Sequence, residues 1–138
     1  MKKIFFPVML IACISAQAQI QIPSSVAAAF IKRFPDVSNV KWTKENAKEY
    51  EAEFQSKGIK MSANFDLNGN WKETETEIPV KDLPEAVIKA ISKKYAAAVI
   101  SGADKIEKPG GKIFYEAEIK INGKKKEVEL YPDGKYVK

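Results

Sequence analysis

The sequence predicts an α+β fold in which a helix and a four-stranded antiparallel meander occur as a tandem repeat. The two copies are expected to form one curved antiparallel sheet with two helices on one face. The main observation is a Tyr-Glu-Ala-Glu stretch, followed by an apolar residue, at both 50–54 and 115–119. Each stretch alternates apolar and acidic residues, which is typical of a strand with one buried face. A second observation is an apolar stripe of helical period ahead of each stretch.

Matching residues recur at nearly constant separation along the chain, which indicates a duplication. Gly69 precedes Gly134 by 65 residues, whereas Val26 precedes Val87 by 61 residues. The difference between 65 and 61 predicts four extra residues in the second copy, around residues 102–111.

The expected elements follow the same order in both copies. Helices are predicted at 23–34 and 84–95, because proline opens each segment and apolar residues recur every four positions. We expect a serine after Pro23 to cap the first helix and Asp82 to cap the second. The expected strands are 39–43, 49–55, 59–65 and 71–78 in the first copy, and 99–107, 112–121, 126–131 and 135–138 in the second.

The turn at residues 66–70 decides whether Trp71 is buried. A two-residue Asn-Gly hairpin would leave Trp71 on the solvent face, whereas a three-residue loop with a glycine bulge would pair it with Phe65. The equivalent turn in the second copy has proline and glycine where a type I turn and a bulge need them. We therefore predict the three-residue loop in both copies, with Trp71 and Tyr136 in the core.

Composition restricts the chemistry that this chain can perform. The sequence has no His and one Cys, Cys13. Histidine therefore cannot act as a general base, triad member or metal ligand. Ser-Lys and paired-carboxylate mechanisms remain open, but the alternating glutamates are typical of any half-buried strand. We expect a protein that is not an enzyme and that uses no cofactor.

Two acidic segments are candidates for metal sites. Residues 66–70 resemble part of a calcium loop, but the glycine is misplaced for an EF-hand and no Glu closes the loop at its twelfth position. Glu73, Glu75 and Glu77 alternate along one expected strand. We interpret that strand as an exposed edge, where like charges discourage pairing with another chain. No metal site is predicted.

The first residues have the pattern of a signal peptide. Lys2 and Lys3 precede an apolar run, and Ala-Gln-Ala at 16–18 is a peptidase recognition pattern, which predicts a signal peptide at 1–18. The alternative is a lipobox that ends at Cys13, which would make the protein a lipid-anchored lipoprotein. We expect a periplasmic or secreted protein without a membrane span.

The rest of the chain divides at the linker between the copies. The first repeat is assigned to 19–79 and the second to 80–138, and together they are expected to form a single domain that is a monomer. The 23 Lys and Arg residues and 18 Asp and Glu residues give a net charge of +5. Loss of Lys2 and Lys3 would reduce it to +3. These charges are interspersed, and nucleic-acid binding is not expected.

The face of the sheet opposite the helices is the candidate binding surface. By strand alternation it carries acidic residues together with two aromatic residues that we expect to be exposed, and exposed aromatic residues often anchor protein interfaces. The candidate partner-binding residues are Phe114, Tyr131, Glu51, Glu53, Glu116 and Glu118.

The whole pattern resembles the PepSY-like secreted proteins with a beta-lactamase-inhibitor-like fold. The resemblance is carried by the proline-opened helices, the Tyr-Glu-Ala-Glu strands, Val40-Lys41-Trp42, and the Phe-Asp-Leu-Asn-Gly-Asn-Trp segment at 65–71. It implies a small envelope protein whose curved sheet has both helices on one side. Related inhibitors hold a partner enzyme with the concave sheet face, but no inhibitory residue can be transferred to this sequence.

Three hypotheses follow from these observations. The leading one is a non-catalytic envelope protein that binds an unidentified protein partner through the open sheet face and inhibits a peptidase or another envelope enzyme. The alternative is a small-ligand or lipid carrier, which needs an enclosed apolar cavity. An enzyme of unfamiliar type would need perturbed titratable groups that converge in a cleft.

Overall fold

The computed structural model describes residues 20–137 of the 138-residue chain. The predicted signal peptide at 1–18 and Cys13 lie outside the described residues.

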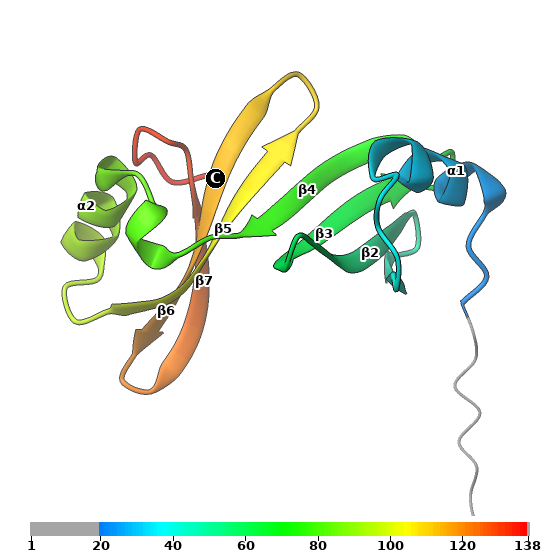
Figure 1. Ribbon diagram of the computed structural model, residues 1–138. Helices are drawn as coiled ribbons and strands as arrows, with labels where there is room; N and C mark the ends of the chain where they lie inside the picture. The colour runs from blue at the N-terminus through cyan, green and yellow to red at the C-terminus, as the bar shows by residue number, and fades with distance from the viewer. Residues whose placement is uncertain (1–19, 138) are drawn as a thin grey trace, which may run out of the picture.

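Seven antiparallel strands form one sheet, and their order in the sheet is their order in the chain, from β1 to β7. The helices are α1 (Ser24–Arg33), the short 3-10 helix η1 (Val80–Asp82) and α2 (Glu85–Lys94). The strands are β1 (Lys41–Asn46), β2 (Glu49–Ser56), β3 (Ile59–Asp66), β4 (Trp71–Glu77), β5 (Val99–Lys108), β6 (Lys112–Ile121) and β7 (Lys124–Leu130). The sheet curls strongly, and α1 and α2 lie toward its opposite ends (Figure 1).

Each helix covers its own core. Val26 and Phe30 of α1 pack on Phe54 and Phe65, and Val87 and Ile91 occupy the equivalent positions in α2. The apolar stripe that predicted both helices is therefore buried, as expected from its period. The two cores contain different residues, but the same sheet continues through both.

Both helices lie on the same face of the sheet, as predicted. Thr74 on β4 pairs with Ala63 on one side and with Glu107 on the other. Ala63 contributes to the core under α1, and strand alternation places Glu107 on the same face as Ala103, which contributes to the core under α2. The predicted fold class is confirmed.

The turn prediction at residues 66–70 is also confirmed. Trp71 pairs with Phe65 after a register shift, and it packs against the first core. Asp66 accepts a hydrogen bond from the Gly69 amide through its carbonyl, and its own amide donates to the Asn70 carbonyl. The second turn repeats this pattern between Tyr131 and Lys135.

Glycine is required at the third position of both turns. Gly69 and Gly134 have φ values of +83° and +84°. A Cβ atom would lie 2.5 Å from the Ser25 carbonyl oxygen at Gly69, and 2.5 Å from the Ala86 carbonyl oxygen at Gly134. Each turn therefore lies directly against the first turn of its helix.

The predicted helix caps were wrong. Pro23 and Pro84 are the N-cap residues, and neither helix has a side-chain cap. Ser25 Oγ donates instead to the Leu67 carbonyl, while Asp82 belongs to η1. The proline carbonyls accept the first helical amide protons, so the backbone of each proline takes the place that a serine or aspartate cap was expected to fill.

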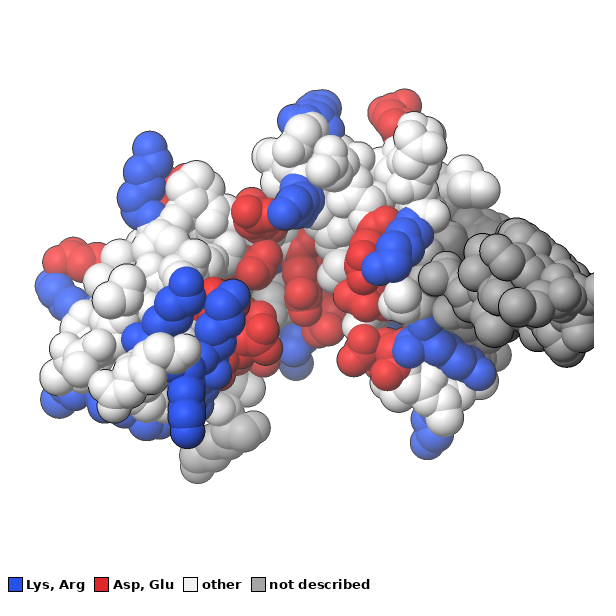
Figure 2. All heavy atoms as spheres, turned by 90° about the horizontal axis from the view of Figure 1, so that it is seen from below, with Lys and Arg blue, Asp and Glu red and all other residues white. Residues whose placement is uncertain are grey.

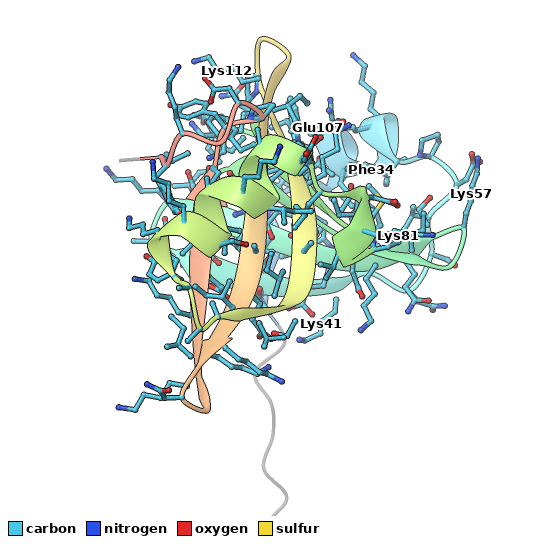
Figure 3. The ribbon with its side chains drawn as sticks, turned by 90° about the vertical axis from the view of Figure 1, so that its left-hand side faces the viewer. Phe34, Lys41, Lys57, Lys81, Glu107 and Lys112 are labelled. Carbon is cyan, nitrogen blue, oxygen red and sulfur yellow. The ribbon has the colours of Figure 1, made fainter. Side chains whose placement is uncertain are left out.

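The extra residues of the second half lengthen the β5–β6 hairpin. Lys44 pairs with Tyr50 in the first half, and Lys105 pairs with Tyr115 at the matching place in the second. Beyond Lys105 the second hairpin continues through three further pairs, ending at Lys108 and Lys112. Glu107 and Lys112 mark this extension, which rises above α2 in the view of Figure 3.

Two strand predictions need correction. The strand with Glu73, Glu75 and Glu77 was expected at an edge, but β4 is the central strand, paired with β3 and β5. Alternating charges are equally compatible with a central strand when one face of the sheet is open to solvent. The expected last strand at 135–138 is reduced to an isolated bridge between Leu130 and Tyr136.

Candidate functional site

The open face is the side of the sheet opposite α1 and α2, which none of the described helices covers. More than half of the chain's 18 acidic residues alternate onto this face. Its acidic residues within the strands include Glu51, Glu53, Glu73, Glu75, Glu77, Asp104, Glu116, Glu118, Glu127 and Glu129. Figure 2 shows acidic side chains in the middle of the molecule, with most Lys and Arg side chains farther out. A protein that is basic overall therefore has a locally acidic face.

Four of these carboxylates form a line across four neighbouring strands. Glu77 on β4 pairs with Asp104 on β5, and Asp104 pairs with Glu116 on β6. Glu116 in turn pairs with Glu129 on β7. We call these four residues the carboxylate ladder. Like charges that face each other directly across a sheet are destabilising, so this arrangement has a cost in stability.

Lysines neutralise only the two ends of the carboxylate ladder. Lys60 Nζ lies 3.9 Å from Glu77 at one end, and Lys108 Nζ lies 3.4 Å from Glu129 at the other. Lys108 also contacts Glu73 at 3.3 Å. Among residues 20–137, neither Asp104 nor Glu116 in the middle has an ion pair.

The pKa values of the central carboxyl groups are raised. Burial and the nearby charge of Glu116 raise the pKa of Glu75 from 4.5 to about 7. Burial and the charge of Glu127 raise the pKa of Glu116 from 4.5 to about 7. Burial and the charge of Glu77 also raise the pKa of Asp104. These three carboxyl groups therefore hold their protons more tightly than solvent-exposed acids.

A hollow of about 710 Å³ lies on the open face beside the carboxylate ladder. Most of the residues that line it are polar or charged. They include Glu51, Glu53, Glu75, Glu77 and Asp104 from the sheet, and Asn39 and Lys41 at its β1 side. A carrier for an apolar ligand would need an enclosed apolar cavity, whereas this hollow is open to solvent and most of its lining residues are polar or charged.

The structure places the four predicted glutamates on the open face but in different surroundings. Glu53 forms an ion pair with Lys41 at 3.0 Å, and Glu51 accepts a hydrogen bond from Thr43 Oγ1 at 3.1 Å. Glu118 pairs with Lys125 at 2.8 Å and accepts a hydrogen bond from Ser101 Oγ. These partners lower the pKa of Glu118, with Lys125 contributing most. Only Glu116 belongs to the carboxylate ladder.

The expectation that Phe114 is exposed was wrong, whereas Tyr131 is exposed. Phe114 lies on the open face but is only 7% exposed, because Tyr131 packs on it with the ring centroids 5.1 Å apart. The Lys108 ammonium lies 4.7 Å from its ring centroid as well. Tyr131 is 42% exposed. Phe114 therefore supports Tyr131 and Lys108 from below instead of presenting its own ring.

Sequence reasoning missed Glu75, Glu77 and Asp104 as members of the site. Glu75 and Glu77 were assigned to an edge strand, and no pattern singled out Asp104. The alternation of the two glutamates with Thr residues was visible, but the common location of all three acids depends on the pairing of β4 with β5. These strands are not joined by a hairpin, so no turn in the sequence sets their register.

The turn that resembles part of a calcium loop uses its carboxylate internally. Asp66 Oδ1 accepts hydrogen bonds from the amides of Asn68 and Asn70, and Oδ2 accepts one from the Asn70 side chain. These bonds, chiefly that of the Asn70 side chain, lower the pKa of Asp66. Among residues 20–137, no group of three or more His, Cys, Asp or Glu is arranged to hold a metal ion.

A family model described as "Putative beta-lactamase-inhibitor-like, PepSY-like" matches residues 14–62 and 48–137, which together span most of the sequence. The chain belongs to this PepSY-like family. The two matches overlap at residues 48–62 and each covers one helix. No curated protein matches the sequence.

Solved structures of Bacteroides proteins share the fold. A chain from Bacteroides eggerthii, described as a "putative periplasmic" protein, is 19% identical with a TM-score of 0.76, covering 86% of this chain and 87% of that one. A DUF2874 family protein from Bacteroides uniformis is 22% identical with a TM-score of 0.74, covering 84% and 86%. A BLIP-like protein from Bacteroides fragilis is 25% identical with a TM-score of 0.67, covering 88% and 86%.

No helix within residues 20–137 is long and apolar enough to cross a membrane.

Proposed function

We propose that this protein is a non-catalytic envelope protein that binds a protein partner through the open face. The observation that carries the proposal is the carboxylate ladder, which lies on a sheet face that no other part of the described chain covers. Such a row of like charges reduces the stability of the sheet. Features that reduce stability without a local gain are typical of functional sites, where an external partner supplies the compensating contacts.

The residues proposed to contact the partner come from both halves of the sheet. Tyr131 is the exposed aromatic residue of the face, and Phe114 supports it. Tyrosine combines a large apolar ring with a polar group, which suits an interface anchor. Glu51, Glu53, Glu116 and Glu118 remain in the proposal. Glu75, Glu77, Asp104 and Glu129 join them, because they line the same hollow or belong to the carboxylate ladder.

Inhibition of a peptidase or another envelope enzyme is part of the proposal. It is supported by membership of a beta-lactamase-inhibitor-like family and by the fold shared with a BLIP-like protein. Fold similarity alone is a weak guide to activity, so the choice of target depends on the open face and not on the family name.

We propose export to the periplasm, with residues 1–18 removed as a signal peptide, or lipid attachment at Cys13 as the alternative. The fold shared with the Bacteroides eggerthii protein, which is described as periplasmic, supports this location. We also propose that 19–79 and 80–138 are duplicated repeats within one monomeric domain. The matching turns at Gly69 and Gly134, each against the first turn of a helix, support the duplication.

The hollows at the described residues favour partner binding over the carrier alternative. The hollow on the open face is lined largely by polar and charged groups. A second hollow of about 350 Å³ lies beside the turn between β2 and β3, with Lys60 and Glu77 in its lining. Neither is the enclosed apolar cavity that a lipid carrier requires.

Site-specific photo-crosslinking in intact cells tests the proposal. A photoreactive amino acid replaces Ser62 or Tyr131, which both lie on the open face. The control places it at Lys89, an exposed position on α2. We expect a discrete crosslinked protein from the two face positions and not from Lys89. Identical products from all three positions, or none from the face, would refute partner binding through this surface.

A further inference from the structure

We propose that the open face binds a basic segment of the partner protein, rich in Arg or Lys, which lies across the strands along the carboxylate ladder. This inference rests on the proposed function and adds the chemistry of the partner to it. It requires a surface of suitable shape, an excess of negative charge on that surface, and groups that can hold a cation in place.

The geometry of the sheet gives the carboxylate ladder its direction and length. Glu77, Asp104, Glu116 and Glu129 face each other on four consecutive strands. Neighbouring strands lie about 4.8 Å apart, so the row extends for about 14 Å at right angles to the strands. A segment several residues long can therefore contact all four carboxylates when it crosses the sheet. The adjacent hollow provides room for its side chains.

The negative charge in the middle of the carboxylate ladder is not neutralised by any ion pair within residues 20–137. Glu75 faces Glu51 from β2, Glu116 from β6, Asp104 from β5 and its own neighbour Glu73. Glu116 faces Glu127 and Glu129 from β7, Asp104 from β5 and Glu73 from β4. In the described part of the chain, the carboxylate ladder forms its ion pairs with Lys60 and Lys108, which lie at its two ends. A cationic segment would relieve this repulsion, which is the electrostatic complementarity expected of an interface.

Lys108 shows how this face holds a cation. Its ammonium group lies between Glu73 at 3.3 Å and Glu129 at 3.4 Å, and 4.7 Å from the centroid of the Phe114 ring. Two carboxylates and one aromatic ring thus surround one ammonium group. Tyr131 presents an exposed ring beside this arrangement, and the carboxylates of Asp104 and Glu116 lie next along the row. The same types of group are therefore available to a lysine or arginine from outside.

The distribution of charge also favours a basic partner. The chain has a net charge of +5, so long-range attraction to a basic protein cannot come from its overall charge. On the face that Figure 2 shows, most acidic side chains lie in the middle. Attraction is then confined to that region, because salt screens charges beyond about 8 Å at physiological ionic strength. This arrangement directs a basic segment to the carboxylate ladder and repels it from the lysine-rich β6–β7 end.

Binding of a labelled octa-arginine peptide, measured by fluorescence anisotropy at pH 8, tests the inference. The variant D104N/E116Q removes the two central carboxylates of the carboxylate ladder while keeping side-chain size. The control D36N/E85Q removes the same charge from exposed positions outside the sheet. We expect D104N/E116Q to weaken peptide binding at least about tenfold and the control to change it less than about twofold. Only D104N/E116Q removes carboxylates that would lie close to the bound peptide.

Several outcomes would overturn the inference. Equal weakening in both variants would mean that the peptide responds only to net charge. If the wild-type protein does not bind the peptide at all, the inference is overturned as well. Calcium binding by the wild-type protein that is lost in D104N/E116Q would identify the carboxylate ladder as a metal site instead. Thermal melting of each variant establishes that a loss of binding does not reflect unfolding.

The failure of this inference differs measurably from failure of the proposed function. Photo-crosslinking from Ser62 and Tyr131 is repeated in the D104N/E116Q background. If the crosslinked partner persists unchanged, the open face binds a protein but the carboxylate ladder does not recognise a basic segment. If the partner is lost while the D36N/E85Q background retains it, both proposals are supported together.

Discussion

The guanidinium carbon of Arg33 lies 3.5 Å from the centroid of the Trp71 ring. The last residue of α1 thus stacks on the residue that follows the first three-residue turn. Lys94, the last residue of α2, takes the same place over Tyr136, with Nζ 4.0 Å from the ring centroid. Both aromatic residues lie at the edge of their core, so the cation covers a ring that would otherwise be open to water.

Arg33→Ala is therefore expected to destabilise the protein. Loss of the stacking interaction and of the cover over Trp71 should lower the free energy of unfolding by about 1 kcal/mol, because cation–π contacts contribute about 0.5–2 kcal/mol depending on exposure. Denaturant titration measures this difference. Lys32→Ala is the control, since Lys32 is an exposed neighbour on the same helix and should change stability by less than about 0.5 kcal/mol. Equal effects would show that the stacking interaction contributes nothing.

Gly69→Ala and Gly134→Ala are expected to be strongly destabilising. Each substitution places a Cβ atom 2.5 Å from a helix carbonyl oxygen and also requires an L residue at positive φ. The positive φ costs about 1–2 kcal/mol, and the clash adds about 1–3 kcal/mol.

Gly58→Ala separates these two effects, because Gly58 has a φ of +81° but nothing within 4 Å of a Cβ atom. Only the conformational cost applies there. The free energy of unfolding of Gly58→Ala should therefore be at least about 1 kcal/mol higher than that of the other two variants. Thermal or denaturant unfolding measures this difference. If all three behave alike, the close approach of turn and helix has no energetic consequence.

Phe114→Ala is expected to lower the free energy of unfolding more than Tyr131→Ala does. Phe114 is 7% exposed, and removal of a buried phenylalanine typically costs about 3–5 kcal/mol. Tyr131→Ala should cost only about 1 kcal/mol, since Tyr131 is 42% exposed and loses mainly its contact with Phe114. Chemical denaturation of the two variants checks the order. A smaller loss for Phe114→Ala than for Tyr131→Ala would contradict the placement of Phe114 under Tyr131.

The fold could be predicted from local signals because those signals agree. The apolar stripes of Val26 and Val87, the alternating strands, and the glycine of each turn all specify the same arrangement. The burial of Trp71 was predictable for the same reason, since turn chemistry sets the register of β3 and β4. The caps were not predictable, because a serine or aspartate caps a helix only when it stands at the N-cap position. Pro23 and Pro84 occupy that position here.

The candidate site was only partly predictable. Strand alternation placed Glu51, Glu53, Glu116 and Glu118 on the open face, but it did not bring Glu77 and Asp104 together. That contact depends on the register between β4 and β5, which are separated by η1 and α2. Register between strands without a connecting turn is determined by packing over the whole sheet. The burial of Phe114 depends on the same long-range arrangement.

The raised pKa values on the open face predict an unusual dependence of stability on pH. Glu75 and Glu116 have pKa values of about 7 in the folded protein, against an ordinary value of 4.5. Below pH 4.5 both the folded and the unfolded protein hold these protons, and the groups have no effect on stability. Between pH 4.5 and about 7 the unfolded chain releases protons that the folded protein retains, so stability falls as pH rises through this interval. Above about pH 7 the full destabilisation is present.

Melting temperatures between about pH 5 and pH 8 test this expectation. The melting temperature of the wild-type protein should be lower at about pH 8 than at about pH 5. At about pH 8, E75Q/E116Q should be more stable than the wild type, and its melting temperature should change less with pH. The control D36N/E85Q should retain the wild-type slope, because neither carboxylate lies on the open face. Asp66 and Glu118 have lowered pKa values and lose their stabilising effect only at more acidic pH, outside this interval. A melting temperature that instead rises with pH would contradict this expectation, and so would an E75Q/E116Q slope equal to that of the wild type. Either result would show that the pKa values of Glu75 and Glu116 are not raised in the folded protein. The open face would then lack the charge repulsion from which recognition of a basic segment was inferred.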